Sequence, residues 1–341
     1  MFSNEKKINS FFIYWLKISL ILVFLIIIIG GLTRLTDSGL SITEWELFIG
    51  ILPPLSENSW NLYFEDYKKI PQYKLLNYSM TLNEFKIIFY WEYIHRLLAR
   101  FIGLFFIIPL IFFHISKKVN KEYINVCYII FILITFQGII GWYMVKSGLV
   151  SDVTVSHYRL SIHLVTAIFI FSSIFWLLRN ATLRQNKPFF KISKNFFPFQ
   201  LLILLIFAQI IIGAFVSGLD AGKIYQTWPL MGNNFFPNDL LVGNLINIVE
   251  FNNHSLVQFY HRNLAYLIIL YILFLSSLIY KKKIFNLYKP LLVVLFITFT
   301  QVILGVTTLL SGLNIYLASA HQITSILLVF SALNLYYLRT K

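Results

Sequence analysis

Eight long apolar runs divide the chain, and polar and charged residues gather between them. Each run is close in length to the about 20 residues that an α-helix needs to cross the hydrocarbon core of a bilayer. The runs are centred near Ile26, Phe105, Leu133, Ile170, Leu205, Leu270, Phe296 and Leu328. This pattern predicts an all-α integral membrane protein with eight transmembrane helices.

The longest interruption covers residues 34–86, between the first and second apolar runs. It is polar and rich in prolines and aromatic residues, as in "ILPPLSENSWNLYFEDYKKIPQY". We expect a structured extramembrane loop that contains short amphipathic helices.

Composition agrees with the membrane assignment, because 58% of the residues are hydrophobic and 12% are charged, against roughly 25% charged in soluble domains. The net charge of +14 would suit a nucleic-acid partner if it were spread over one surface. Instead the basic residues gather before the first span and in every second connection, which is the positive-inside pattern. We therefore expect no nucleic-acid partner, both termini in the cytoplasm and the long loop outside.

The amino-terminal stretch "MFSNEKKINSFF" contains an acidic residue and lacks the arginine-rich, amphipathic character of an organellar transit peptide. A bacterial inner (cytoplasmic) membrane is therefore the expected location. The single cysteine, Cys127, has no partner for an intramolecular disulfide and indicates nothing about the redox compartment.

The chain also repeats itself. "QGIIGWYMVKSGL" from Gln137 matches "QVILGVTTLLSGL" from Gln301, and "GGLTRLTDSG" from Gly30 matches "GAFVSGLDAG" from Gly213. The segment "EYIHR" from Glu92 matches "QFYHR". These matches predict two duplicated four-helix bundles, a first half at residues 1–178 and a second half at residues 179–341, in parallel orientation because each unit spans an even number of crossings.

Four of the seven histidines lie inside predicted spans: His95, His163, His261 and His321. The other three, His114, His157 and His254, fall at span ends or in loops. The four are predicted at one depth near the outer face, roughly one to three helical turns from the start of spans two, four, six and eight. Ionisable residues inside membranes are rare and usually functional, although a lone histidine on an apolar helix is more often a hydrogen-bonded core residue.

Two histidines from two helices of one bundle can bind both axial positions of a haem iron. Zinc or copper would more often need a cysteine, a carboxylate or a third imidazole close by. We therefore predict one haem site in each half. Arg96 and Arg262, each next to a histidine, are placed to pair with haem propionates, while snorkelling to the interface is the simpler explanation for an isolated arginine.

Several motifs of the chain point to one family. They are "GGLTRLTDSGLSITEW", "EFKIIFYWEYIHRLLAR", "FQGIIGWYMVKSGL", "RLSIHL", "QTWPLM", "QFYHRNLAY", "QVILGVTTLLSG" and "AHQ". With these motifs the sequence resembles the haem A synthases of alphaproteobacteria and mitochondria over nearly its whole length from Gly30. It implies an eight-span oxidoreductase that oxidises the C8 methyl group of haem O to a formyl group. The product, haem A, serves terminal oxidases.

The resemblance also implies residue roles. His95 and His163 would flank the substrate haem in the first half, and His261 and His321 would ligate the iron of a haem b cofactor in the second half. Glu92 would be the acidic residue that the chemistry requires. The implied partners are haem O, a haem O synthase and an electron acceptor or donor, and the sequence leaves a homo-oligomer open.

The repeat gives an independent reason to single out Glu92. Glu92 and His95 are three residues apart and share one helix face, whereas the second half has Gln258 at the matching position. A carboxylate can accept a proton or stabilise developing positive charge, which a neutral amide cannot do. The competing structural explanation is an i,i+4 ion pair between Glu92 and Arg96.

Two other functions use the same histidines. A dihaem b-type cytochrome that relays electrons from quinol would have two equivalent, permanently bound haems. It would not explain why the first half has Glu92 where the second half has Gln258. A haem transporter or chaperone would bind haem without changing it.

Overall fold

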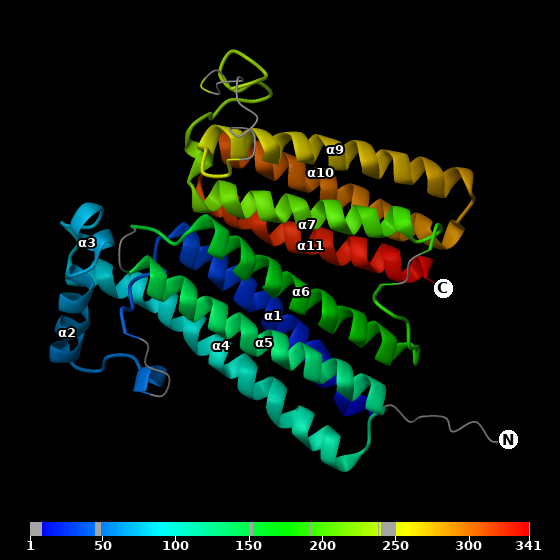
Figure 1. The fold of residues 1–341 in the computed structure, drawn as a ribbon, viewed down its shortest axis with the longest axis horizontal. Helices are drawn as coiled ribbons and strands as arrows, with labels where there is room; N and C mark the ends of the chain where they lie inside the picture. The colour runs from blue at the N-terminus through cyan, green and yellow to red at the C-terminus, as the bar shows by residue number, and fades with distance from the viewer. Residues whose placement is uncertain are drawn as a thin grey trace. The chain divides into compact units, whose positions relative to one another are not determined.

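A computed structural model describes residues 9–44, 49–149, 153–190, 193–237, 239 and 250–340. Within these ranges it contains eight helices that are long and apolar enough to cross a membrane (Figure 1). They are α1 (Ser10–Leu35), α4 (Leu82–Ser116), α5 (Lys121–Gly148), α6 (His157–Thr182), α7 (Phe197–Gly218), α9 (His254–Lys281), α10 (Tyr288–Leu310) and α11 (Ile315–Arg339). The prediction of an all-α membrane protein with eight spans is confirmed.

Shorter elements lie in the connections. The segment between α1 and α4 contains α2 (Glu57–Lys68), α3 (Pro71–Leu75) and a 3₁₀ turn, η1 (Ile49–Ile51). Two further 3₁₀ turns are present: η2 (Ala221–Lys223) follows α7, and η3 (Phe285–Leu287) precedes α10. Lys6, Lys7 and Lys341, on which part of the topology prediction rests, lie outside the described residues.

Helix α4 begins earlier than the apolar pattern suggests, at Leu82. A capping box explains the start: the Thr81 side chain accepts a hydrogen bond from the backbone N–H of Glu84, and the Glu84 carboxylate accepts one from the backbone N–H of Thr81. Such reciprocal bonds satisfy donors that a helix start leaves unpaired. His95 consequently lies more than three turns after the start of α4, whereas the sequence predicts it roughly one to three turns from the start of its span.

An aromatic cluster joins α2 to the first turns of α4. Trp60, Phe64 and Tyr67 of α2 are buried against Phe85 and Phe89 of α4. The ring centroids of Trp60 and Phe89 are 5.0 Å apart, and those of Phe64 and Phe85 are 5.1 Å apart. These distances are typical of favourable aromatic pairs, so the cluster gives the connection between α1 and α4 a core of its own.

The chain forms two compact units. The first contains the residues up to Arg159 together with Thr166–Asn186, and the second contains Leu160–Val165 together with Lys187 onward. In the first unit α4 packs against both α1 and α5. The indole N–H of Trp15 in α1 donates to the backbone oxygen of Phe105 in α4 at 3.1 Å, which holds these two helices together.

In the second unit, α9 and α11 each contact both α7 and α10. The Tyr271 hydroxyl of α9 donates to the backbone oxygen of Pro198 in α7 at 2.8 Å. The Gln200 amide of α7 donates to the Tyr336 hydroxyl of α11 at 2.8 Å. These contacts place α7 beside both α9 and α11, the two helices that contain His261 and His321.

Candidate functional site

His261 of α9 and His321 of α11 face one another inside the second unit. Their ring centroids are 6.5 Å apart and their planes make an angle of 76°. A metal–imidazole bond is about 2 Å long in well-characterised zinc sites, so the separation of the two rings suits ligation of one metal ion from two sides. The structure therefore brings together the histidine pair that the sequence assigns to the second half.

Each of these rings lies against a glycine of a neighbouring helix. A Cβ added to Gly213 of α7 would come within 3.0 Å of Cε1 of His261, and a Cβ added to Gly305 of α10 would come within 2.9 Å of Cε1 of His321. Cβ contacts this short are not tolerated without movement of a neighbour. The two glycines therefore create the space in which the rings lie.

A glutamine lies one helical turn before each glycine. The Nε2 atom of Gln209 is 3.2 Å from Nδ1 of His261 and 3.0 Å from its backbone oxygen, to which it donates. The Nε2 atom of Gln301 is 3.4 Å from Nε2 of His321. The hydroxyl of Thr324 donates to the side-chain oxygen of Gln301.

Several buried polar atoms of this site have no hydrogen-bond partner among the described residues. They are Nδ1 of His321, Oε1 of Gln209 and Nε of Arg262. Buried polar atoms are normally paired, and an exception calls for an explanation such as a ligand. Axial ligation would use a nitrogen of His321, and a propionate would pair with the guanidinium of Arg262. The residues therefore fit a haem.

The same set fits a structural zinc ion poorly. Among the residues that the structure describes, no three His, Cys, Asp or Glu side chains are grouped so that they could hold a metal ion. Zinc sites in proteins use three or four such ligands. A metal held by two facing imidazoles needs its remaining ligands from elsewhere, and a porphyrin supplies four nitrogens.

Gln258 and Arg262 attach the segment after α7 to α9. The backbone oxygen of Tyr225 accepts hydrogen bonds from Nε2 of Gln258 at 2.8 Å and from Arg262 at 2.9 Å. Arg262 also donates to the backbone oxygen of Leu230 at 3.2 Å. Gln258 and Arg262, which match Glu92 and Arg96 in the repeat, thus attach this connecting segment to α9 next to His261.

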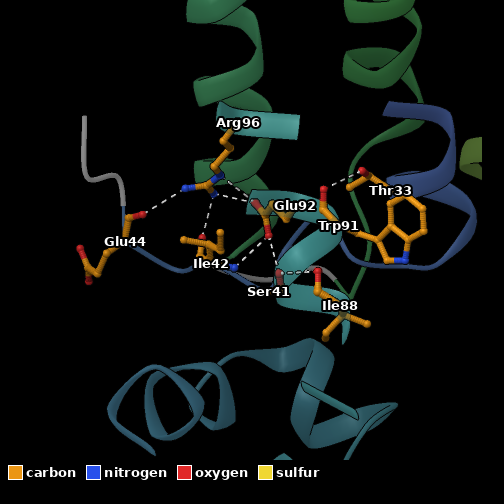
Figure 2. A network of polar contacts seen from close by, with 8 residues as sticks. All are labelled: Thr33, Ser41, Ile42, Glu44, Ile88, Trp91, Glu92 and Arg96. Atoms are coloured by element: carbon orange, nitrogen blue, oxygen red, sulfur yellow. Dashed lines mark hydrogen bonds and ion pairs between the residues drawn. The ribbon is translucent and has the colours of Figure 1, made fainter. Parts of the chain in front are cut away.

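Glu92 and Arg96 attach the segment after α1 to α4 in the corresponding way (Figure 2). Oε2 of Glu92 accepts from the Ser41 hydroxyl and from the backbone N–H of Ile42, both at 2.8 Å. Arg96 donates to Oε1 of Glu92 at 2.6 Å and to the backbone oxygens of Ile42 at 2.8 Å and Glu44 at 3.1 Å. The i,i+4 ion pair that sequence reasoning raised as an alternative role for Glu92 is therefore present.

The Glu92 side chain is 3% exposed and that of Arg96 is 10% exposed. A buried carboxylate is costly unless it is paired and hydrogen-bonded, and here both oxygens of Glu92 have donors. The pairing fixes a negative charge one turn from His95. Such a fixed charge suits electrostatic stabilisation of a nearby cation, and the same ion pair holds the loop to α4.

His95 lies against Gly30 of α1, where an added Cβ would come within 3.1 Å of Nε2 of His95. Gly30 matches Gly213 in the sequence repeat, so the contact of His95 corresponds to that of His261. His163 lies in α6, within the segment Leu160–Val165 that groups with the second unit. The pairing of His95 with His163 stays a prediction.

Sequence reasoning missed Gln209, the glycine contacts and the partners of Glu92 in the loop. The spacing of a glutamine four residues before a glycine recurs at Gln137, Gln209 and Gln301, and this recurrence is the signal that could have indicated Gln209. Ser41 and Ile42 had no such signal, because they follow α1 in an irregular segment.

Comparisons with known proteins identify the family. Residues 13–333 match the family model of cytochrome oxidase assembly proteins (COX15-CtaA). A "Heme A synthase" of Pelagibacter ubique is 50% identical over 331 residues, 97% of each chain. Proteins of the same name from Wolbachia pipientis and Flavobacterium psychrophilum are 42% and 40% identical, over 95% of this chain and 92% and 96% of their own. The chain belongs to the haem A synthase family of cytochrome oxidase assembly proteins.

Proposed function

We propose that this protein is a haem A synthase, which oxidises the C8 methyl group of haem O to a formyl group in a membrane. The observation that carries the proposal is the pair of facing histidines, His261 and His321, in a chain that matches relatives named "Heme A synthase" along nearly its full length. Two imidazoles on separate helices are a common way to hold a haem iron.

The two halves have different roles in this proposal. In the second half, His261 and His321 ligate the iron of a resident haem b, and Arg262 pairs with its propionates. In the first half, His95 and His163 flank the iron of the substrate haem, and Arg96 lies beside its polar edge. The bound haem b supplies a one-electron redox centre.

Glu92 is the proposed catalytic residue of the first half. Removal of a proton and two electrons from the methyl group, with the electrons passing to the proposed electron acceptor, leaves an electron-poor carbon, and a fixed carboxylate stabilises such developing positive charge. Arg96 and the Ile42 N–H hold the Glu92 carboxylate in place. In the second half the neutral Gln258 makes the same kind of loop contact, which supports catalysis in the first half alone.

The direct test is to make this chain together with a haem O synthase in cells that lack their own haem A synthase. Haems extracted from the membranes are separated and weighed by mass spectrometry. We expect a haem with a formyl group, and its absence from well-expressed membranes would contradict the proposal. A dihaem cytochrome or a haem carrier would leave haem O unchanged.

The ligand roles are tested on purified protein. Replacing His261 or His321 with alanine should remove the low-spin b-type absorption spectrum. If this spectrum survives both changes and disappears when His95 is replaced instead, the two halves have been assigned the wrong way round.

We further propose that both termini face the cytoplasm of a bacterium, with α2 and α3 on the other side of the inner membrane. The basic residues of the connections support this orientation. Green fluorescent protein fused after Arg339 should fluoresce, and alkaline phosphatase inserted between α3 and α4 should be active. The opposite result in both fusions would reverse the topology. The proposed partners are a haem O synthase, which supplies the substrate, and an electron acceptor or donor.

A further inference from the structure

The Gln209 amide lies beside both ring nitrogens of His261. Its Nε2 atom is 3.2 Å from Nδ1 and 3.4 Å from Nε2 of the imidazole. The same atom donates to the backbone oxygen of His261 at 3.0 Å. Gln209 is therefore within hydrogen-bond distance of both ring nitrogens of His261.

The other end of this amide is an unused acceptor. Oε1 of Gln209 is buried and has no hydrogen-bond partner in the described part of the chain. When one nitrogen of a neutral imidazole binds a metal, the other nitrogen carries a hydrogen and acts as a donor. The terminal torsion of a glutamine is broad and roughly two-fold, so a turn of the amide can present Oε1 as an acceptor to that N–H, with loss of the bond from Nε2 to the backbone oxygen of His261.

The first half lacks this group at the matching place. Gly30 contacts His95 as Gly213 contacts His261, but the residue one turn before Gly30 is Ile26, whereas the residue one turn before Gly213 is Gln209. An isoleucine has no hydrogen-bond acceptor in its side chain. His95 and His261 occupy matching positions in the repeat. One turn before the contacting glycine, however, α1 has an isoleucine and α7 has a glutamine.

We propose that Gln209 is a positioning residue for the His261 ligand, which fixes the imidazole and strengthens its donation to iron, and that α1 has no such group at the matching position, Ile26. A hydrogen-bonded ligand histidine is more basic and better oriented than an unsupported one. The inference rests on the proposed role of His261 as a haem ligand.

Gln301 is the related residue of α10 and differs in one respect. Its side-chain oxygen already accepts from Thr324, so the amide is held with Nε2 toward His321. A turn of either amide gives up one hydrogen bond, that of Gln301 with Thr324 or that of Gln209 with the backbone oxygen of His261. Of the two amide oxygens, that of Gln209 is the one without a partner in the described part of the chain before the turn. We therefore assign the effect on the midpoint potential of the resident haem b to Gln209.

The test compares the purified protein with the variants Gln209→Leu and Gln209→Glu. Leucine is similar in size to glutamine and has no acceptor, whereas a carboxylate is a stronger acceptor than an amide. We expect the midpoint potential of the bound haem b to become more positive in Gln209→Leu and more negative in Gln209→Glu, because a more basic ligand stabilises ferric iron. A merely structural role would not move the potential in opposite directions.

Loss of haem b from either Gln209 variant also tests the proposal. If Gln209→Leu loses haem b and Gln209→Glu retains it, the acceptor role is supported, and loss in both variants overturns it. Unchanged potentials in both variants also overturn it. Retention of haem b by His261→Ala would instead contradict the proposed ligand, so the two failures are distinguishable.

The reciprocal change gives a matched control. Ile26→Gln places an amide one turn before Gly30 and should leave the potential of haem b unchanged. It should increase the amount of haem O or haem A that copurifies with the protein. A shift in the potential of haem b by Ile26→Gln would show that the effect is not local to His261 and would overturn the inference.

Discussion

The His261 ring lies directly against Gly213, where a Cβ would come within 3.0 Å of Cε1. The His321 ring lies against Gly305 of α10 in the same way. We predict that Gly213→Ala displaces the imidazole and weakens binding of haem b. Overpacking typically costs about 1–3 kcal/mol, so affinity should fall roughly 10- to 100-fold. The measurement is haem content per protein after purification.

Gly103 provides the control for this prediction. A Cβ on Gly103 of α4 would meet nothing within 4 Å, so Gly103→Ala should retain a full content of haem. Equal haem contents in the two variants would show that the Gly213 contact does not limit the site.

Glu92→Gln should abolish production of haem A while haem b remains bound. The exchange is nearly isosteric and makes the motif of α4 read like that of α9, but it removes the negative charge. Assistance by such a group is typically worth roughly 10² to 10⁴ in rate. Mass spectrometry of extracted haems should show haem O or a hydroxymethyl intermediate.

Ser41→Ala separates the charge of Glu92 from its role as a contact for the loop. It removes one of the hydrogen bonds to Oε2 and leaves the carboxylate and Arg96 unchanged. We expect substantial haem A from Ser41→Ala. If Glu92→Gln also makes near-normal amounts, Glu92 serves only as the partner of Arg96 and the loop.

Tyr67→Phe should loosen the segment between α1 and α4. The buried Tyr67 hydroxyl donates to Oε1 of Gln72 at 3.0 Å and accepts from Asn77 at 2.7 Å, and burial raises the pKa of Tyr67 to about 12. Leaving a buried acceptor unpaired costs about 1–3 kcal/mol. Faster proteolysis within α2 and α3 would be the readout. Tyr78→Phe, at an exposed tyrosine, should have no effect.

Acid should release the segment that follows α7. Burial alone would raise the pKa of Asp239, but hydrogen bonds from Ser255 at 2.6 Å and Tyr225 at 2.7 Å lower it below the ordinary value. A lowered carboxyl pKa stabilises the folded state above the unfolded value of about 3.9 and loses this contribution as pH falls through the folded value. Hydrogen exchange near Tyr225 should accelerate below about pH 4.

Asp239→Asn tests the origin of that acid response. An amide does not titrate, so the variant should exchange at a rate that is independent of pH once the intrinsic chemistry is corrected. An acid response of the same size in Asp239→Asn would assign the effect to another group.

The spans could be predicted from sequence because the length of an apolar run and the thickness of a bilayer are sufficient to define them. The pair of His261 and His321 could be predicted because both histidines lie at one depth. The contact of Gln209 with His261 could not, since α7 is apolar around most of its circumference and hydropathy does not reveal which side faces α9. The bonds of Glu92 to Ser41 and Ile42 depend on the path of an irregular segment, which no periodicity describes.

Helix α4 is 35 residues long, or about 52 Å at 1.5 Å per residue, whereas the hydrocarbon core is about 30 Å thick. One continuous helix therefore passes through the bilayer and projects beyond it. Phe85 and Phe89 join its early turns to the aromatic cluster of α2, and Glu92 and His95 follow on the next turns. We expect a tilt imposed on α2 to displace the carboxylate and the imidazole together, because Phe85, Phe89, Glu92 and His95 all lie on α4.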